Sequence, residues 1–315
     1  MREIGGYLEL DKYELPMLHD GAVALNCGRS CLRYLIKAHC ITKILLPKFL
    51  CDSVIEVCEK EHVVIRYYSI QENFMPINID NSLDEWIYIV NFYGQLDNVQ
   101  LQQIVNKYKN VIIDQTQAYF QLPIKGVDTF YSCRKFFGVS DGAFLYTDTT
   151  LPDTIPQDES FCRMKYILGR FEKNAAEFYG EYILNNENFS EEPIKKMSKL
   201  TDNLLHGINY NKIRSIRTNN YRYLYEKFAS LNRLKLKKLD GAFMYPLYIE
   251  NGDKIRQKLR LLKIYIPVLW PNVLNDCKEN QCEYRMAKNI LPLPCDQRYK
   301  EEEMIYMAEQ IKSIL

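Results

Sequence analysis

The sequence DTFYSCRKFFGVSDGAFLY, residues 128–146, reads as a strand, a polar loop and a second strand. A β-favouring run of Thr, Phe and Tyr comes first, and the chain is extended again after a tight turn at Gly142. Between the strands lies Lys135, with Ser132 three residues before it and Arg134 beside it. A lysine at a strand end, next to a hydroxyl and a second cation, is suited to forming a Schiff base with an aldehyde beside a bound phosphate.

The chain before this stretch alternates between apolar segments and amphipathic ones. The apolar segments predict strands at residues 23–26, 43–46, 63–70, 86–93 and 110–114, and the amphipathic ones predict helices at 31–38, after Asp52 and at 99–108. Strands that alternate with helices are typical of an α/β protein with a mostly parallel sheet. Ligands of such sheets bind beyond the carboxyl ends of the strands. We therefore expect the polar residues of 26–30, 91–94, 114–117 and 132–135 to converge on one site.

The sequence pattern changes after residue 150. Helices are predicted at 162–184, within 195–231, at 253–262 and at 301–314; strands are predicted at 243–249 and 265–269, and a polar connection at 185–193. These elements predict a smaller α+β domain packed on the first. The expected division is an N-terminal arm and large domain over residues 1–195, with a short strand at 7–10, and a smaller domain over 196–315.

Composition excludes several classes of protein. The net charge of +1 argues against nucleic acid as a partner, and no apolar run approaches the ~18 residues of a membrane helix. No signal peptide is recognised, so a cytoplasmic location is expected. The 10 cysteines form no CxxC pair and the four histidines do not cluster, so no metal site is predicted. We expect reduced thiols that serve as small apolar side chains.

Two further groups could take part in chemistry with Lys135. Asp114 ends the apolar run VIID, and Gln117 follows three residues later. Asp114 is either a helix cap or a carboxylate that keeps a pyridinium nitrogen protonated. The residues Gly28, Arg29 and Ser30 open a helix directly after a strand, which is either an ordinary turn or a phosphate-binding helix N-terminus.

In this order, the motifs resemble those of the DegT/StrS-like sugar aminotransferases, which are fold-type I enzymes dependent on pyridoxal 5'-phosphate (PLP). Residues 91–94 (NFYG) resemble the family's His-x-Tyr-Gly, and residues 114–118 (DQTQA) resemble its Asp-Ala-Ala-Gln-Ala. Residues 132–143 resemble the loop that carries the lysine, and residues 291–294 (LPLP) resemble its Leu-Ser-Leu-Pro close. The resemblance spans nearly the whole chain and implies a large PLP-binding domain followed by a smaller C-terminal one.

The resemblance also assigns roles to particular residues. Lys135 forms the Schiff base and then moves a proton, Asp114 pairs with the pyridine nitrogen, and Gln117 contacts the ring oxygen. The resemblance assigns Gly28, Arg29, Ser30 and Ser132 to the phosphate of PLP. It assigns Cys51 or Phe49 as the residue that covers the pyridine ring. The implied reaction moves an amino group from an amino acid, glutamate being expected, to a keto group on a nucleotide-linked sugar. This reaction serves surface-polysaccharide or amino-sugar biosynthesis. The implied assembly is a homodimer.

The chain also departs from the family pattern. The family carries a serine five residues before the lysine, where this chain has Phe130. The family's asparagine that reaches the neighbouring subunit's phosphate has no counterpart around residues 195–198, and residues 150–195 diverge.

Four alternatives follow from these observations. A sugar dehydratase of this family has His in place of Lys135, so the lysine argues against it. An inert or regulatory homologue and a PLP enzyme with a non-sugar substrate remain open. A cysteine hydrolase is disfavoured because no histidine has a recognisable setting.

Overall fold

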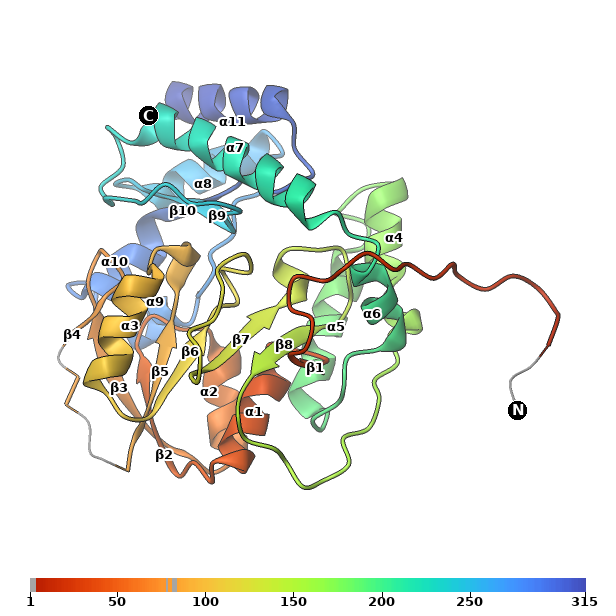
Figure 1. Cartoon of the computed structure of the whole chain (residues 1–315). Helices are drawn as coiled ribbons and strands as arrows, with labels where there is room; N and C mark the ends of the chain where they lie inside the picture. Colours follow the sequence, from red (N-terminus) through yellow and green to blue (C-terminus); the bar gives the residue numbers. More distant parts are fainter. Residues whose placement is uncertain (1–3, 78, 81–83) are drawn as a thin grey trace.

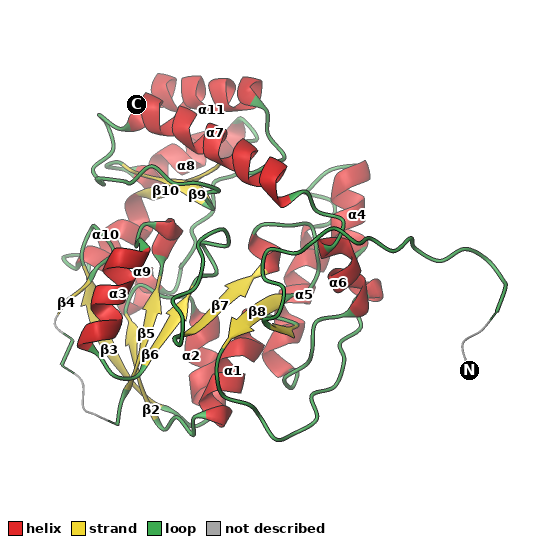
Figure 2. Cartoon of the chain, viewed as in Figure 1, coloured by secondary structure: helices red, strands yellow, loops and turns green. Residues whose placement is uncertain are grey.

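A computed structural model describes residues 4–77, 79–80 and 84–315. Its main feature is an eight-stranded sheet with helices packed on it, and a second, two-stranded sheet lies in the C-terminal part (Figure 1 and Figure 2). The first described residues run away from the body as an extended arm. The expected strand at residues 7–10 is wrong: these residues are exposed and have no strand conformation.

The large sheet has the strand order β1-β8-β7-β6-β5-β2-β3-β4. Its strands are β1 Val23–Leu25, β2 Lys43–Pro47, β3 Val64–Ile70, β4 Pro76–Ile77, β5 Trp86–Val90, β6 Val111–Asp114, β7 Asp128–Ser132 and β8 Ala143–Tyr146. The five central strands, from β7 to β3, are parallel, whereas β1, β8 and β4 pair antiparallel with their neighbours. The prediction of an α/β fold with a mostly parallel sheet is confirmed.

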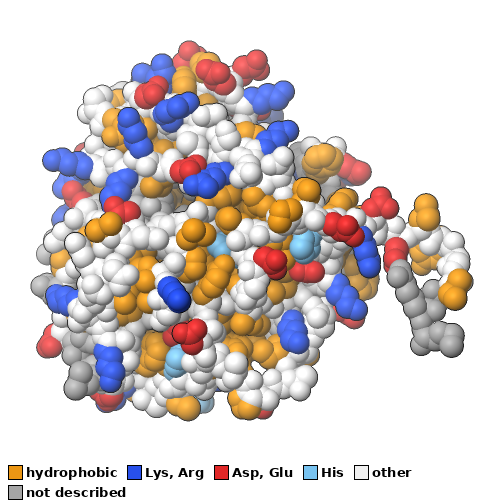
Figure 3. Space-filling model, in the orientation of Figure 1, with side chains coloured by type: hydrophobic (Ala, Val, Ile, Leu, Met, Phe, Trp, Pro, Cys, Tyr) orange, Lys and Arg blue, Asp and Glu red, His pale blue; other side chains and the backbone are white. Residues whose placement is uncertain are grey.

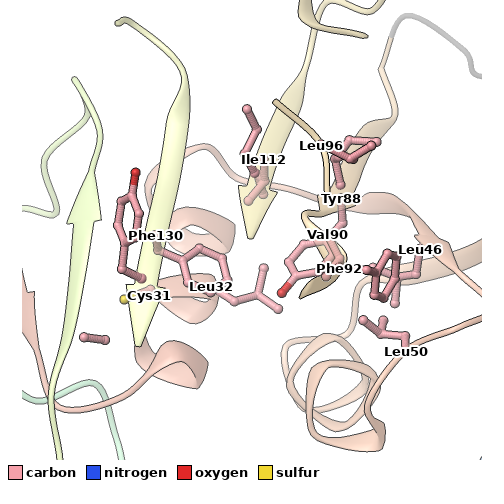
Figure 4. Packing of buried hydrophobic residues seen from close by; sticks show 14 of the residues in the cluster. Cys31, Leu32, Leu46, Leu50, Tyr88, Val90, Phe92, Leu96, Ile112 and Phe130 are labelled. Carbon is pink, nitrogen blue, oxygen red and sulfur yellow. The ribbon is translucent and has the colours of Figure 1, made fainter. Parts of the chain in front are cut away.

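Three helices connect strands of this sheet: α1 Gly28–Ala38, α2 Asp52–Lys60 and α3 Asn98–Lys107. Helix α1 packs on β7 and β8, and α2 packs on β3. Figure 4 shows part of the core, in which Leu32 of α1 lies beside Phe130 of β7. All four residues of β6 are buried, as a central strand covered on both faces requires.

The region from 160 to 230 contains four helices: α4 Lys165–Glu172, α5 Tyr179–Glu191, α6 Lys199–Leu205 and α7 Tyr210–Phe228. The single helix predicted at 162–184 is broken between α4 and α5. The polar connection predicted at 185–193 is largely helix α5. Its composition is polar, but Asn185 and Phe189 are buried four residues apart on one face, so tertiary contacts stabilise a helix that the composition does not suggest.

The C-terminal part comprises β9 Met244–Tyr248 and β10 Ile290–Pro294, which pair antiparallel, with α8 Gly252–Leu261, α9 Val273–Asp276, α10 Cys282–Asn289 and α11 Glu301–Ile314. A separate apolar cluster, including Leu224, Tyr245, Leu293, Met304 and Ile311, joins α7, α8 and α11 to this small sheet. The strand predicted at 265–269 is absent: the segment is a loop. Pro267 within it lacks the N–H that a central strand needs. The boundary at 195/196 stays a prediction.

The surface matches the balanced composition. On the face in Figure 3, acidic and basic side chains are interspersed and do not gather in one patch. Within the described ranges, no helix is long and apolar enough to cross a membrane, and no cluster of His, Cys, Asp and Glu is arranged to hold a metal. All ten cysteines are free, and six of them are buried.

Candidate active site

The carboxyl ends of β2, β5, β6 and β7 meet the N-terminus of α1 around one cavity of about 410 Å³. This volume lies within the range of sites for small molecules, roughly 300–1,000 Å³. The polar and charged lining residues are Arg29, Ser53, Asp114, Thr116, Gln117, Ser132, Arg134, Lys135 and Asn186. Three of the four predicted polar segments, 26–30, 114–117 and 132–135, therefore contribute residues to this cavity, as expected. The fourth segment, 91–94, contacts the cavity residue Gln117 through the main chain of Tyr93.

Lys135 ends a single 3-10 turn, η2 Cys133–Lys135, directly after β7. Its side chain lines the cavity, and its Nζ donates a hydrogen bond of 2.8 Å to Thr116 Oγ1. The protein around the amine removes part of its hydration, and this lowers the pKa of Lys135, while the carboxylate of Asp114 acts in the opposite direction. Arg134 and Arg29 lower the pKa further because they place positive charge near the amine. A lysine of this kind is a better nucleophile near neutral pH than a solvated one.

Asp114 is the last residue of β6, between Val90 of β5 and Phe130 of β7 in the sheet register. Both of its carboxylate oxygens accept hydrogen bonds: Oδ1 from the Thr116 N–H at 2.8 Å, and Oδ2 from the Tyr88 hydroxyl at 2.7 Å. The Tyr88 side chain is fully buried, and both burial and the neighbouring carboxylate raise the pKa of this phenol. The phenol therefore stays protonated and fixes the plane of the carboxylate.

Gln117 faces the same cavity from the turn after β6. Its Oε1 accepts a hydrogen bond of 2.8 Å from the Tyr93 N–H, so its orientation is set by the turn at 91–94. This leaves the Nε2 group as the donor that a ligand oxygen can use. Cys51 and Leu50 line the cavity, whereas Phe49 is buried against Trp270, with ring centroids 4.4 Å apart.

The side of the cavity next to α1 is positively charged. Gly28 begins α1, and Cys27 before it makes no side-chain cap, so the first N–H groups of this helix remain for a ligand. Arg29 and Arg134 lie on either side of Asn186 and donate to its main-chain oxygen and its Oδ1, respectively. Among the described residues, neither guanidinium forms an ion pair with a carboxylate. Two such arginines beside an uncapped helix N-terminus form a site for an anion such as phosphate.

The loop that carries Lys135 is fixed at its far end. Gly142 has φ +112°, and a Cβ there would lie 3.0 Å from Thr201 Cγ2 and 3.2 Å from Cys133 Cβ, so the predicted glycine turn is required. The buried carboxylate of Asp141 accepts hydrogen bonds from the Ser198 N–H at 2.7 Å, from the Ser198 hydroxyl at 2.8 Å and from the Thr201 hydroxyl. These bonds attach the loop to the start of α6.

Most of the residues predicted from the sequence meet at this cavity: Gly28, Arg29, Cys51, Asp114, Gln117, Ser132 and Lys135 all line it. Ser30 is not among the lining residues. Its side chain is buried, and its hydroxyl donates to Asn26 Oδ1 at 2.6 Å.

The sequence patterns do not single out several of the lining residues. Thr116 lies between two predicted residues, so the motif itself could have indicated it. Tyr88 is hidden in an apolar strand. The residues Tyr182, Asn186, Phe243, Leu269 and Trp270 come from distant segments without a recognisable motif.

No protein-family model matches the sequence, and no curated protein matches it. Among solved structures, the chain is similar to the sugar aminotransferase CalS13 from Micromonospora echinospora, with a TM-score of 0.65 and 16% identity, covering 93% of this chain and 87% of that one. It is also similar to the PLP-form of the putative sugar aminotransferase Spr1654 from Streptococcus pneumoniae, with a TM-score of 0.65 and 15% identity, covering 94% and 88%.

A DegT DnrJ EryC1 StrS aminotransferase from Brucella abortus has a TM-score of 0.61 and 12% identity to the chain, covering 93% and 85%. The chain thus has the fold of the DegT/StrS-type sugar aminotransferases, as the motifs predict. The low identity agrees with a divergent sequence.

Proposed function

We propose that the protein is a PLP-dependent aminotransferase that moves an amino group from an amino acid to a keto group of a sugar. The observation that carries this proposal is the meeting of Lys135, Asp114 and the two arginines of the anion site in one cavity. An amine, a carboxylate and an anion site correspond to the aldehyde, the pyridine nitrogen and the phosphate of PLP. The fold shared with sugar aminotransferases is consistent with this assignment.

PLP, when bound, supplies an aromatic ring that accepts electrons from the substrate's α-carbon. Lys135 Nζ, which lines the cavity, would hold the cofactor's aldehyde group and would serve as the base that moves a proton. Asp114, whose carboxylate is oriented by its two donors, would pair with the ring nitrogen. Gly28, Arg29, Ser132 and Arg134 would hold the phosphate, and Gln117 Nε2 would donate to the ring oxygen.

Glutamate as the donor, a nucleotide-linked sugar as the acceptor and a role in polysaccharide or amino-sugar biosynthesis are further parts of the proposal. So are a homodimer, a cytoplasmic location and the division of the chain at residue 195. The donor, the acceptor, the biosynthetic role and the homodimer are supported by the motifs that resemble the DegT/StrS-like family. The division is supported by the change of sequence pattern after residue 150, and the location stays the expectation drawn from the sequence.

Spectroscopy tests the proposal. Purified protein mixed with PLP is expected to turn yellow, and borohydride treatment followed by peptide mass spectrometry is expected to find the reduced cofactor on Lys135. Addition of glutamate should then convert the bound cofactor to the pyridoxamine form and release 2-oxoglutarate. Protein that takes up no PLP would refute the proposal. Uptake without conversion by any amino acid would instead favour the inert homologue.

A further inference from the structure

Asn186 on helix α5 joins the two arginines of the anion site. We propose, resting on the function proposed above, that Asn186 holds Arg29 and Arg134 as a phosphate clamp and thereby completes the cofactor site within a single chain. The sequence predicts no residue for this role, because the family asparagine that reaches a neighbouring subunit's phosphate has no counterpart near residues 195–198.

The two contacts of Asn186 involve separate oxygen atoms. Arg29 Nη1 donates to the main-chain oxygen at 3.2 Å, and Arg134 Nη2 donates to Oδ1. Arg29 comes from the first turn of α1 and Arg134 from the loop before Lys135, so Asn186 links the two segments that frame the proposed phosphate site. The oxygen atoms also offset part of the repulsion between the two guanidiniums. The side-chain Nδ2 remains as a donor, and Asn186 itself lines the cavity.

Helix α5 is attached to the lysine-bearing loop on both sides of Asn186. Asn185 Nδ2 donates to the Ser140 oxygen at 2.9 Å, which ties the helix to the far part of this loop. Phe189, one turn along the helix, is buried, and the Arg134 guanidinium lies 4.8 Å from its ring centroid. Asn186 therefore lies between two fixed points of its own helix.

The end of α5 is also held by the two helices that flank the cavity. Arg33 of α1 donates to the Glu192 oxygen at 2.5 Å, and Lys60 of α2 donates to the Ser190 oxygen at 2.7 Å. With its middle and its C-terminal end attached, α5 acts as a fixed wall of the site. The clamp is thus organised before a ligand binds, which reduces the entropic cost of binding.

The segment at 195–198 is engaged in other contacts of the same chain. The Asn26 N–H donates to the Lys195 oxygen at 3.0 Å, and the Met197 N–H donates to the Ala24 oxygen at 3.1 Å. Ser198 caps α6 and binds the loop that carries the lysine. Asn186 of α5 lies at the anion site of the same chain, so it can replace the contact that the family asparagine makes with a neighbouring subunit's phosphate.

The test compares binding of PLP with binding of pyridoxal, which has the aldehyde and ring but no phosphate. Apo-protein is titrated with each compound, and binding is followed by absorbance. Asn186→Ala is expected to weaken PLP binding by about 10- to 100-fold, the range of one or two hydrogen bonds to a charged group, and to change pyridoxal binding less than about threefold. Asn188→Ala, at an exposed position of the same helix, is the matched control and should change neither.

Asn186→Asp separates anion binding from folding. The new carboxylate keeps Arg134 in place by forming an ion pair, and the main-chain oxygen that Arg29 contacts is unchanged, so the melting temperature should not fall. Its charge should repel phosphate and weaken PLP binding more than Asn186→Ala does. Wild-type binding of PLP should also stay constant when the protein is diluted until sedimentation shows only monomer.

Three results would overturn the inference while leaving the proposed function intact: equal losses of PLP and pyridoxal binding in Asn186→Ala, unchanged PLP binding in both variants, or PLP binding that disappears in the monomer. Failure of the wild-type protein to take up PLP would instead refute the proposed function and this inference with it.

Discussion

Arginines on two sides of the lysine-bearing loop have opposite environments. Arg217 of α7 is 1% exposed, and its three nitrogens donate to the Phe136, Ala242 and Phe243 oxygens and to Gln297 Oε1, at 2.8–3.3 Å. Burial lowers the pKa of this guanidinium, but carbonyl dipoles satisfy its donors. Arg29 and Arg134, in contrast, face a cavity and share the oxygens of a single asparagine.

The difference separates a structural arginine from a ligand-binding one. Arg217 crosslinks α7, the segment before β9 and the residue after Lys135, so its interactions are complete without a ligand. The two cavity arginines keep positive charge that a bound anion can neutralise. Substitutions and a pH titration can distinguish these two kinds of arginine and the lysine between them.

Lys135→Ala should abolish covalent capture of PLP completely. The variant should keep its melting temperature, because the amine lies in a cavity beside two like charges and makes one hydrogen bond. Borohydride trapping with mass spectrometry and thermal melting measure the two effects. Wild-type levels of trapped cofactor in this variant would show that another lysine bonds the aldehyde.

Arg217→Met should lower the free energy of unfolding by about 3–5 kcal/mol, because it leaves several buried carbonyl groups without donors. Urea denaturation followed by circular dichroism measures this loss. PLP affinity, measured where the variant is fully folded, should stay within a few-fold of wild type. A large loss of affinity with unchanged stability would contradict the structural role.

Arg134→Gln should show the reverse pattern. The loss of charge at the anion site should weaken PLP binding by about 10- to 100-fold, with pyridoxal binding nearly unchanged. Stability should change by less than about 1 kcal/mol, since removing one of two neighbouring positive charges relieves repulsion. Titration of both compounds and urea denaturation distinguish this outcome from a folding defect.

The rate of PLP capture should rise with pH and level off once Lys135 is deprotonated. Because partial loss of hydration and the two arginines lower the pKa of Lys135, the midpoint should lie below the ordinary lysine value of about 10.5. Arg134→Gln removes one of these positive charges, so its midpoint should lie at higher pH than that of wild type. A shift to lower pH would mean that Arg134 does not act on the amine through its charge.

Thr116→Val should give the smallest effect. The variant keeps the shape of the side chain but loses the hydroxyl that accepts a hydrogen bond from Lys135 Nζ. We expect the rate of PLP capture to fall a few-fold, about the worth of one hydrogen bond, because the amine is no longer oriented. Thr116→Ser keeps the hydroxyl and should retain the wild-type rate.

The segments up to residue 146 are largely predictable because their signals are local. Apolar runs mark the buried parallel strands, and the polar residues that follow them must gather at one edge of a parallel sheet. The order of strands and polar residues along the chain is therefore enough to place Asp114, Gln117, Ser132 and Lys135 around one cavity.

The errors fall where local composition and tertiary environment disagree. Helix α5 contains the run NNENFSE, whose composition predicts a connection, yet Asn185 and Phe189 attach it to the lysine-bearing loop. The sequence pattern predicts only that Tyr88 lies in an apolar strand. Its hydroxyl donates a hydrogen bond to Asp114 because β5 and β6 are neighbours in the sheet.

Periodicity and order along the chain are enough to predict the α/β architecture and to indicate Lys135 and Asp114 as candidate site residues. What surrounds these two residues follows from the packing of the whole chain. Segments far apart in sequence pack together to form the walls of the cavity, which include α5 and aromatic side chains of the C-terminal part. The same packing leaves Arg29 and Arg134 without acidic partners among the described residues. No pattern within a short window carries information about such packing.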